Sequence, residues 1–260
     1  PRFSLFRFQK VLSVLKETGQ DFPAKKLDVL RSGLFDKKLM TSKECSLVVA
    51  RCMAEILRIT APDAPYSDEE MTEVFKLIMQ HLEALKKPSG PDFVQACELL
   101  QTVASCKCFL MLCYTDMVLL LRLIDQFFDT IQSEHFETRV AEVMLIIMTD
   151  VTTELDEVPT ELLQTVLQRL KDKDDAPEAY QLAKHLLVRA ARVLEPPLSA
   201  HLGHLLDEAE RRAAELEDNE VVNKNEVERQ KKELQSTLFD VMYDVFVVSP
   251  DLLLHVLPTL

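Results

Sequence analysis

Residues 47–70 read LVVARCMAEILRITAPDAPYSDEE and describe two helices with a sharp break between them. In the first half, apolar side chains recur at spacings of three and four, which is typical of a helix. This helix is expected to end near Thr60, because Pro62 and Pro65 each drive the preceding residue out of the helical region. Ser67, with a glutamate three residues later, forms a capping box and predicts the start of the next helix.

The segment between these helices is expected to be a stiff, extended link, with Asp63 between two prolines. A rigid link loses little conformational entropy when a partner docks. Its two alanines leave room beside Tyr66, and the Asp63 carboxylate can accept a hydrogen bond from a donor such as an arginine. The residues alone leave two interpretations open, because proline-rich turns between helices are also common as purely structural elements.

The same helical period continues through the rest of the chain, and no segment shows the clean alternation of a strand. Helices are expected at 3–16, 24–32, 42–59, 67–87, 91–106, 114–132, 136–154, 159–171, 177–194, 197–217 and 226–247. Prolines fit the beginnings of several of these helices, because amide donors in a first turn lack partners anyway. These prolines are Pro91, Pro159, Pro177, Pro196 and Pro197.

Successive helix pairs begin at steps of about 40–50 residues, the period of two-helix HEAT-type repeats. Each pair has an apolar face that it cannot bury alone, so neighbouring pairs stack. The sequence therefore predicts an all-α, HEAT-repeat α-solenoid of stacked antiparallel helix pairs over residues 1–260, with a globular bundle of unrelated helices as the alternative. Residues 205–234 are charged almost throughout, and they either prolong two helices or form a loop at their tip. Because the chain opens at Pro1, we expect a piece of a longer protein.

The charge balance argues against nucleic acid as a partner. Acidic residues outnumber basic ones by 43 to 30, which gives a formal net charge of −13. A surface of that sign repels phosphate backbones, so we expect no direct nucleic-acid binding by this segment. No apolar run approaches the roughly 20 residues that span a bilayer, so we expect no membrane partner either.

The residue types needed for catalysis or cofactor binding are missing. With four scattered glycines the chain has no phosphate-binding loop, and it has no nucleophile elbow and no HExxH metal motif. We therefore expect no enzyme activity and no cofactor. Two constellations could ligate a metal, but neither has the paired spacing of a zinc site, so we expect buried thiols and surface histidines. The two are Cys106, Cys108 and Cys113, and His201 with His204.

Three stretches resemble the Pds-five (precocious dissociation of sisters) family of cohesin-associated HEAT-repeat regulators. Residues 58–66, RITAPDAPY, match the family's R-I-x-A-P-[DE]-A-P-[YF] helix end throughout. Residues 182–189, LAKHLLVR, resemble its L-A-K-x-L-L-x-R helix, and residues 249–258, SPDLLLHVLP, resemble its x-P-x-L-L-L-x-V-x-P close. The three stretches follow one another in the order expected for the N-terminal portion of the family.

The resemblance implies a nuclear, chromatin-associated, non-enzymatic scaffold that binds cohesin subunits and the release factor Wapl, and so regulates sister-chromatid cohesion. It also implies that the alanine–proline link forms part of a docking pocket for short Tyr-Ser-Arg motifs in Wapl-type partners. That role falls on Ala61, Pro62, Asp63, Ala64, Pro65 and Tyr66. We infer in addition that Asp63 meets the arginine of the motif. The alternative is a HEAT-repeat adaptor of another complex, for example a nuclear transport or phosphatase scaffold.

Overall fold

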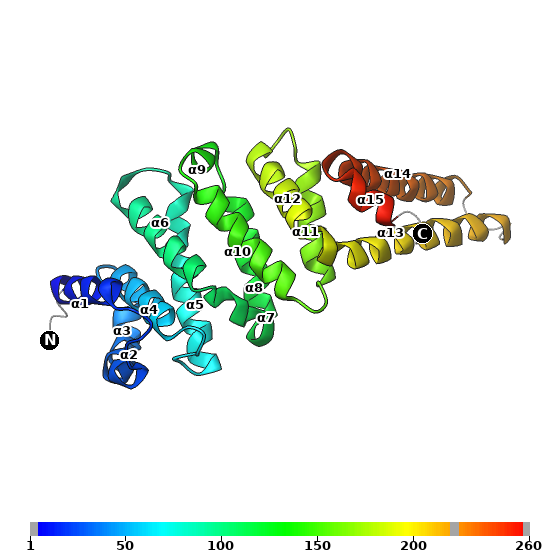
Figure 1. The fold of residues 1–260 in the computed structure, drawn as a ribbon. Coiled ribbons are helices and arrows are strands. Elements are labelled where there is room, and N and C mark those ends of the chain that lie inside the picture. Colours follow the sequence, from blue (N-terminus) through cyan, green and yellow to red (C-terminus); the bar gives the residue numbers. More distant parts are fainter. Residues whose placement is uncertain (1–4, 219–223, 257–260) are drawn as a thin grey trace. The chain divides into compact units, whose positions relative to one another are not determined.

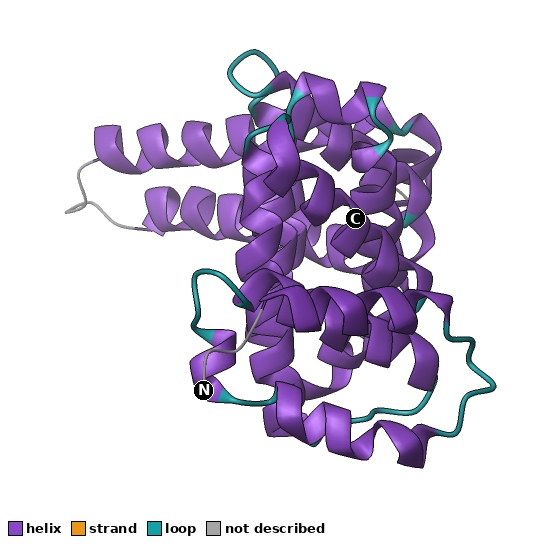
Figure 2. Cartoon of the chain, turned by 90° about the vertical axis from the view of Figure 1, so that its left-hand side faces the viewer, coloured by secondary structure: helices purple, strands orange, loops and turns teal. Residues whose placement is uncertain are grey.

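The computed structural model describes residues 5–218 and 224–256, and every regular element within them is a helix (Figure 2). The all-α, HEAT-type class predicted from the repeat period is confirmed. The chain divides into two compact units, Pro1–Glu154 and Leu155–Leu260. Among the described helices, none is by itself long and apolar enough to cross a membrane. One pair bent by 62°, Gly90–Ser105 with Cys108–Thr115, meets the length and composition only when taken together.

Short connections join the helices of the first unit, and the longer of these helices have about four turns. Three 3₁₀ turns, labelled η, lie among ten α-helices in the described part of this unit. In chain order they are α1 (Leu5–Glu17), η1 (Ala24–Leu27), α2 (Asp28–Leu34), α3 (Lys37–Met40), α4 (Ser46–Thr60), α5 (Asp68–Leu82), η2 (Glu83–Lys86), α6 (Gly90–Ser105), η3 (Cys108–Met111), α7 (Leu112–Thr115), α8 (Met117–Thr130), α9 (Ser133–Glu137) and α10 (Val140–Glu154).

Helix α4 packs among the N-terminal helices of the first unit (Figure 1). Most of its residues are buried, as expected for the apolar stretch that precedes the link. A helix that is apolar on most sides needs neighbours on most sides. It contacts α1, α2 and α3 from the N-terminal segment, α5 through the link, and α6 from the next pair.

The helix pairs of this unit follow one another in two layers. In one layer α6 contacts both α4 and α10, and in the other α5 contacts α8. Aromatic side chains fill the space between neighbouring pairs. The rings of Phe75 on α5 and Phe109 on η3 lie 5.4 Å apart between centroids, and both side chains are fully buried. Each pair thus buries its apolar face against the next, as the repeat period predicts.

The second unit begins with the pair α11 (Thr160–Lys171) and α12 (Pro177–Arg189). It continues with α13 (Ala191–Asp218), α14 (Lys224–Val248) and α15 (Pro250–Val256). Helices α13 and α14 lie side by side, and the charged stretch predicted at 205–234 falls on them (Figure 1). Residues 205–218 continue α13 and residues 224–234 belong to α14, whereas 219–223 lie outside the described residues.

One predicted helix start is wrong. Pro196 and Pro197 lie inside α13, which begins at Ala191. The break comes earlier, at Ala190, whose carbonyl accepts the first amides of the new helix at 3.0 Å. The helix continues through the prolines because a buried leucine stripe runs on at spacings of four, and this burial outweighs the amide donors that the two prolines lack. The stripe consists of Leu194, Leu198 and Leu202.

Candidate protein-docking site

The link between α4 and α5, residues 61–66, is a tight turn, and we call it the docking turn. The N–H of Asp63 donates to the carbonyl of Thr60 at 2.9 Å, and the peptide bond between Ala61 and Pro62 is cis. A hydrogen bond between residues three apart closes a four-residue turn. The extended link expected from the two prolines is therefore wrong at this point, although helix α4 does end at Thr60 as predicted.

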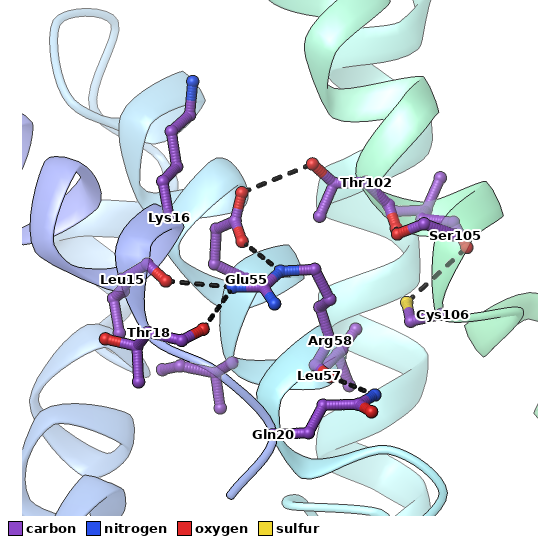
Figure 3. A network of polar contacts seen from close by, with 12 residues as sticks. Leu15, Lys16, Thr18, Gln20, Glu55, Leu57, Arg58, Thr102, Ser105 and Cys106 are labelled. Atoms are coloured by element: carbon purple, nitrogen blue, oxygen red, sulfur yellow. Dashed lines mark hydrogen bonds and ion pairs between the residues drawn. The ribbon is translucent and has the colours of Figure 1, made fainter. Parts of the chain in front are cut away.

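Arg58, in the last turn of α4, fixes the start of the docking turn against α1 (Figure 3). Its Nη2 donates to the carbonyl oxygens of Leu15 at 3.0 Å and Thr18 at 2.8 Å. These carbonyls lie at the end of α1, where a helix leaves its last carbonyl groups without partners in the helix. The side chain of Gln20 in turn donates to the carbonyl of Arg58 at 3.0 Å. The end of α4 is thereby joined to the segment that follows α1.

A buried carboxylate completes this arrangement. Glu55, one turn before Arg58, is almost entirely buried. Its Oε2 accepts a hydrogen bond from Arg58 Nε at 2.6 Å. Its Oε1 lies 3.4 Å from the hydroxyl of Thr102 on α6, whose single proton is shared with the carbonyl of Glu98 at 3.0 Å. A buried carboxylate is costly unless it is paired, so the guanidinium and the carboxylate each need the other. The same end of α4 is therefore joined to α6 as well as to α1.

The other end of the docking turn is fixed by the cap of α5. The N–H of Ser67 donates to Glu70 Oε2 at 3.1 Å, and the N–H of Glu70 donates to Ser67 Oγ at 3.3 Å. The capping box predicted from these two residues is confirmed. Because both ends are fixed, the residues between them form a preorganised surface feature.

Tyr66, expected at the docking surface, lies behind it. Its ring is buried against α2, where the ring of Phe35 lies 6.2 Å away and the guanidinium of Arg31 lies 5.7 Å from the ring centroid. Burial raises the pKa of the phenol, and Arg31 opposes that effect only in part. Among the residues that the structure describes, none forms a hydrogen bond with the buried hydroxyl. Tyr66 thus supports the turn from inside.

The middle of the docking turn faces outward. Pro62, Asp63 and Ala64 are exposed, whereas Ala61 and Pro65 are half-buried. Within the described part of the chain, the Asp63 carboxylate makes no hydrogen bond or ion pair. A carboxylate in that state keeps its full capacity to accept from a partner's donor groups.

Two cavities flank Asp63. The larger, of about 500 Å³, has one wall made by the docking turn and another made by residues 105–111, where α6 ends and η3 begins. The smaller, of about 190 Å³, lies between the docking turn and η1 and α2. Asp63 lines both cavities, and the larger one also takes in Pro62. The turn therefore separates two hollows, with a carboxylate between them.

The wall opposite the docking turn was not identified from the sequence. It depends on Lys107, which adopts a left-handed conformation with φ 53° and ψ 28° and so redirects the chain between α6 and η3. Positions of this kind favour glycine or asparagine, and a lysine gives no local signal of such a bend. The cysteines on either side of it, which were considered as metal ligands, line the cavity. In the described ranges, no three His, Cys, Asp or Glu side chains come close enough together to hold a metal ion.

Comparison with known proteins places the chain in one family. The family model described as sister chromatid cohesion protein PDS5 matches residues 4–260. The PDS5 homolog C of Arabidopsis thaliana is 33% identical over 192 residues, which make up 72% of this chain and 22% of that protein. The PDS5 homolog A-B of Xenopus laevis is 31% identical over 225 residues, which make up 84% of this chain and 16% of that protein.

A solved structure has the same fold. A chain from the structure of the Pds5–Scc1 complex superposes with a TM-score of 0.79 at 23% sequence identity, covering 98% of this chain and 38% of that one. The chain spans about a fifth of the length of the curated plant relative and less of the vertebrate one. The family match covers both units and includes the docking turn. The chain belongs to the PDS5 family of sister chromatid cohesion proteins.

Proposed function

We propose that this chain is part of a nuclear, chromatin-associated, non-enzymatic scaffold that regulates sister-chromatid cohesion by holding cohesin subunits and their regulators. Membership of the PDS5 family supports this role, as does the fold that the chain shares with the Pds5 chain solved in complex with Scc1. The distribution of polar groups also favours a scaffold, since the buried ones described above join helices to one another. They include Glu55 and Arg58.

More finely, we propose that the docking turn binds short Tyr-Ser-Arg motifs of a Wapl-type release factor. The observation that carries this proposal is the exposed, unpaired carboxylate of Asp63 at the border of two cavities. An arginine can donate two parallel hydrogen bonds to a carboxylate, which gives orientation as well as affinity. The larger cavity, of about 500 Å³, is wide enough for an aromatic side chain beside that contact.

We assign different roles to the residues of the docking turn according to their exposure. Tyr66 is buried, so it shapes the turn and does not reach the peptide. The residues available for direct contact are the exposed ones, Pro62, Asp63 and Ala64, and the cavity-lining parts of Ala61 and Pro65. Because both ends of the turn are fixed, little conformational entropy is lost on docking.

Isothermal titration of a Tyr-Ser-Arg peptide into the 260-residue chain tests this assignment. Asp63→Lys reverses the charge at the border of the cavities and is expected to weaken binding about tenfold or more. Asp63→Asn keeps the shape of the side chain, and its peptide affinity is expected to lie between those of Asp63→Lys and the wild type. Because the Asp63 side chain has no hydrogen-bond or ion-pair partner among the described residues, neither substitution should lower the melting temperature by more than a degree or two.

The matched control is Asp174→Lys, which makes the same change of charge at an exposed turn in the second unit that lines neither cavity. Its peptide affinity should equal that of the wild type. If both lysine variants lose the same peptide affinity, the effect comes from the net charge of the chain and not from the site. If neither loses affinity, Asp63 does not belong to the site. A pull-down from nuclear extract that recovers transport factors or phosphatase subunits, and no cohesin subunit, would contradict the cohesin role.

A further inference from the structure

Two cysteines lie in the cavity wall that faces the docking turn. Cys106 follows the end of α6 and Cys108 begins η3, and both line the cavity of about 500 Å³. Their sulfur atoms lie near a single acceptor, the carbonyl oxygen of Val103, at 3.5 Å from Cys106 and 3.7 Å from Cys108. The two thiols are therefore close neighbours, and nothing assigned so far uses them.

The residue between them sets their separation. Lys107 has φ 53° and ψ 28°, the left-handed helical conformation. A residue in a helical conformation of either hand places the Cα atoms of its two neighbours about 5.4 Å apart, from the radius and rise of the helix. Disulfides join Cα atoms that lie roughly 4.4–6.8 Å apart. The backbone at Cys106 and Cys108 is thus already within the range of a disulfide.

The two thiols differ in accessibility and in pKa. In thiol exchange the attacking cysteine must be accessible and ionised, whereas the resolving cysteine only has to lie beside it. Cys106 is partly exposed to the cavity, whereas Cys108 is buried. A hydrogen bond from the Cys108 thiol lowers the pKa of Cys106, and Arg58 contributes in the same direction. The same hydrogen bond, together with burial, raises the pKa of Cys108. The thiolate therefore forms at the accessible sulfur, and the thiolate is the reactive species.

The other perturbed thiols have the opposite tendency. Burial raises the pKa of Cys97, raises that of Cys113 to about 11, and raises that of Cys52 to about 12. Thiols with raised pKa values are poor nucleophiles near neutral pH. Reaction with a soluble reagent should consequently concentrate at Cys106.

We propose that Cys106 and Cys108 form a reversible disulfide by exchange with a small-molecule disulfide of the glutathione type. The Cys106 thiolate attacks one sulfur of the reagent, whose S–S bond breaks and releases one thiolate. That thiolate takes the proton of Cys108. The Cys108 thiolate then attacks the Cys106 sulfur and releases the second reagent thiolate, which takes up the proton that Cys106 gave to water when it ionised. Two protein thiols are oxidised to one disulfide, and one reagent disulfide is reduced to two thiols.

This bond changes the wall opposite Pro62 and Asp63. The sulfur atoms move toward each other. Neither sulfur keeps a hydrogen, so neither can donate a hydrogen bond to the carbonyl of Val103. Peptide binding at the docking turn is expected to differ between the reduced and oxidised states by about threefold or more. This consequence rests on the proposed function, whereas formation of the disulfide does not.

Trypsin offers a direct readout, because Lys107 lies between the two cysteines. In a Cys97→Ser, Cys113→Ser background, cleavage after Lys107 separates residues 87–107 from residues 108–122, and each peptide keeps one cysteine. The chain is incubated with a fixed ratio of reduced to oxidised glutathione, its free thiols are blocked, and it is digested without reductant. We expect the two peptides to be joined in the mass spectrum and to separate after reduction.

Single substitutions separate the two roles. Cys108→Ser should accumulate a mixed disulfide with glutathione on Cys106, because no resolving thiol remains. Cys106→Ser should remain unmodified at Cys108, because the buried thiol is not reached. Unlinked, fully blocked peptides in the parent protein, or the absence of any adduct in Cys108→Ser, would overturn the thiol-pair proposal.

The binding consequence is measured by titrating the Tyr-Ser-Arg peptide into the reduced and oxidised forms of the same background. A difference in affinity supports the coupling, and equal affinity with the disulfide formed overturns it. If the peptide binds neither form while the disulfide still forms, the docking proposal fails and the thiol pair stands. The two failures are therefore distinguishable.

Discussion

Two polar clusters cross the same side of α4, and each joins α1 to α6. The exposed cluster consists of Lys16, Arg51 and Glu98, with Lys16 Nζ at 2.5 Å from Glu98 Oε2 and Arg51 paired to the same carboxylate. The buried cluster consists of Glu55 and Arg58 with their hydrogen-bond partners. The clusters differ in their carboxylates, since the side chain of Glu98 is 42% exposed and that of Glu55 is 5% exposed. The arginines do not follow this difference, because the side chain of Arg51 is 11% exposed and that of Arg58 is 24% exposed.

The difference shows which cluster determines the geometry of the docking turn. Exposed ion pairs contribute only about 0–1 kcal/mol, because water and salt screen them and two long side chains must be ordered. A buried pair adds little net stability, but removal of one partner leaves an uncompensated charge in the protein interior. Arg58 of the buried cluster also joins the start of the docking turn to the end of α1. Its guanidinium donates to the carbonyls of Leu15 and Thr18, and its own carbonyl accepts from the side chain of Gln20.

The largest effect is expected from Arg58→Met. It leaves the Glu55 carboxylate buried without its cation, so the free energy of unfolding should fall by about 3–5 kcal/mol. Urea denaturation followed by circular dichroism measures this loss. The affinity for the Tyr-Ser-Arg peptide should fall as well, because the turn loses its attachment to the end of α1.

The double variant Glu55→Met, Arg58→Met provides the control for this prediction. Replacing both charges by apolar groups of similar size should recover most of the lost stability, because no unpaired charge remains. A double variant that is no more stable than Arg58→Met would mean that lost packing, and not the unpaired carboxylate, causes the damage.

A smaller effect is expected from a buried group that has no ion pair, His135 between α8 and α10. Its Nδ1 accepts from the N–H of Gln132 at 2.9 Å, and its Nε2 lies 2.9 Å from the carbonyl of Leu85, so Nε2 carries the proton. Desolvation by burial lowers its pKa from 6.5. As the pH drops below about 6.5, this histidine is protonated more readily in the unfolded chain than in the folded chain. The free energy of unfolding therefore falls with the pH.

Melting curves of the wild type and of His135→Gln at pH 7.5 and 5.5 measure this contribution. The wild type should lose more stability than the variant over this interval, with an upper bound of about 1.4 kcal/mol for a single group whose ordinary pKa is 6.5. The histidines at positions 81 and 201, whose pKa values are also lowered, contribute equally to both proteins and cancel in the difference. Parallel losses in the two proteins would contradict the assignment to His135.

The smallest effect is expected from Lys16→Met in the exposed cluster. Arg51 remains on the Glu98 carboxylate, so the free energy of unfolding should change by less than about 1 kcal/mol. The change should shrink further in 0.5 M salt, because the Debye length falls below the size of the cluster. Loss of peptide affinity in this variant would contradict the distinction between the two clusters.

Local signals in the sequence predicted the elements whose causes are local. The end of α4 at Thr60 and the cap of α5 at Ser67 depend on neighbours within a few residues, and both were predicted correctly. The role of Arg58 was not predictable in this way, because its backbone partners lie 40 and 43 residues away in sequence. The bend at Lys107 was missed because its residue type disfavours the conformation that packing imposes on it.

The role of the docking turn in binding stays a prediction, and the structure adds where its side chains lie. Asp63 was expected at a surface and lies between two cavities, whereas Tyr66 was expected beside the ligand and lies in the core. Its burial depends on Arg31 of α2 and on Phe35, the residue that follows α2, which no pattern within the link could indicate. The direction in which an aromatic side chain points is decided by tertiary packing, even when its backbone position is clear.

The buried hydroxyl of Tyr66 also bears on which substitutions this position tolerates. Among the described residues none accepts or donates a hydrogen bond to it, and the contacts with Phe35 and Arg31 involve the ring alone. A phenylalanine would keep both contacts and remove a desolvated polar atom. Tyrosine and phenylalanine should therefore be nearly equivalent here, and Tyr66→Phe is expected to leave the free energy of unfolding nearly unchanged. The packing at this position requires the shape of the ring and makes no use of its hydroxyl.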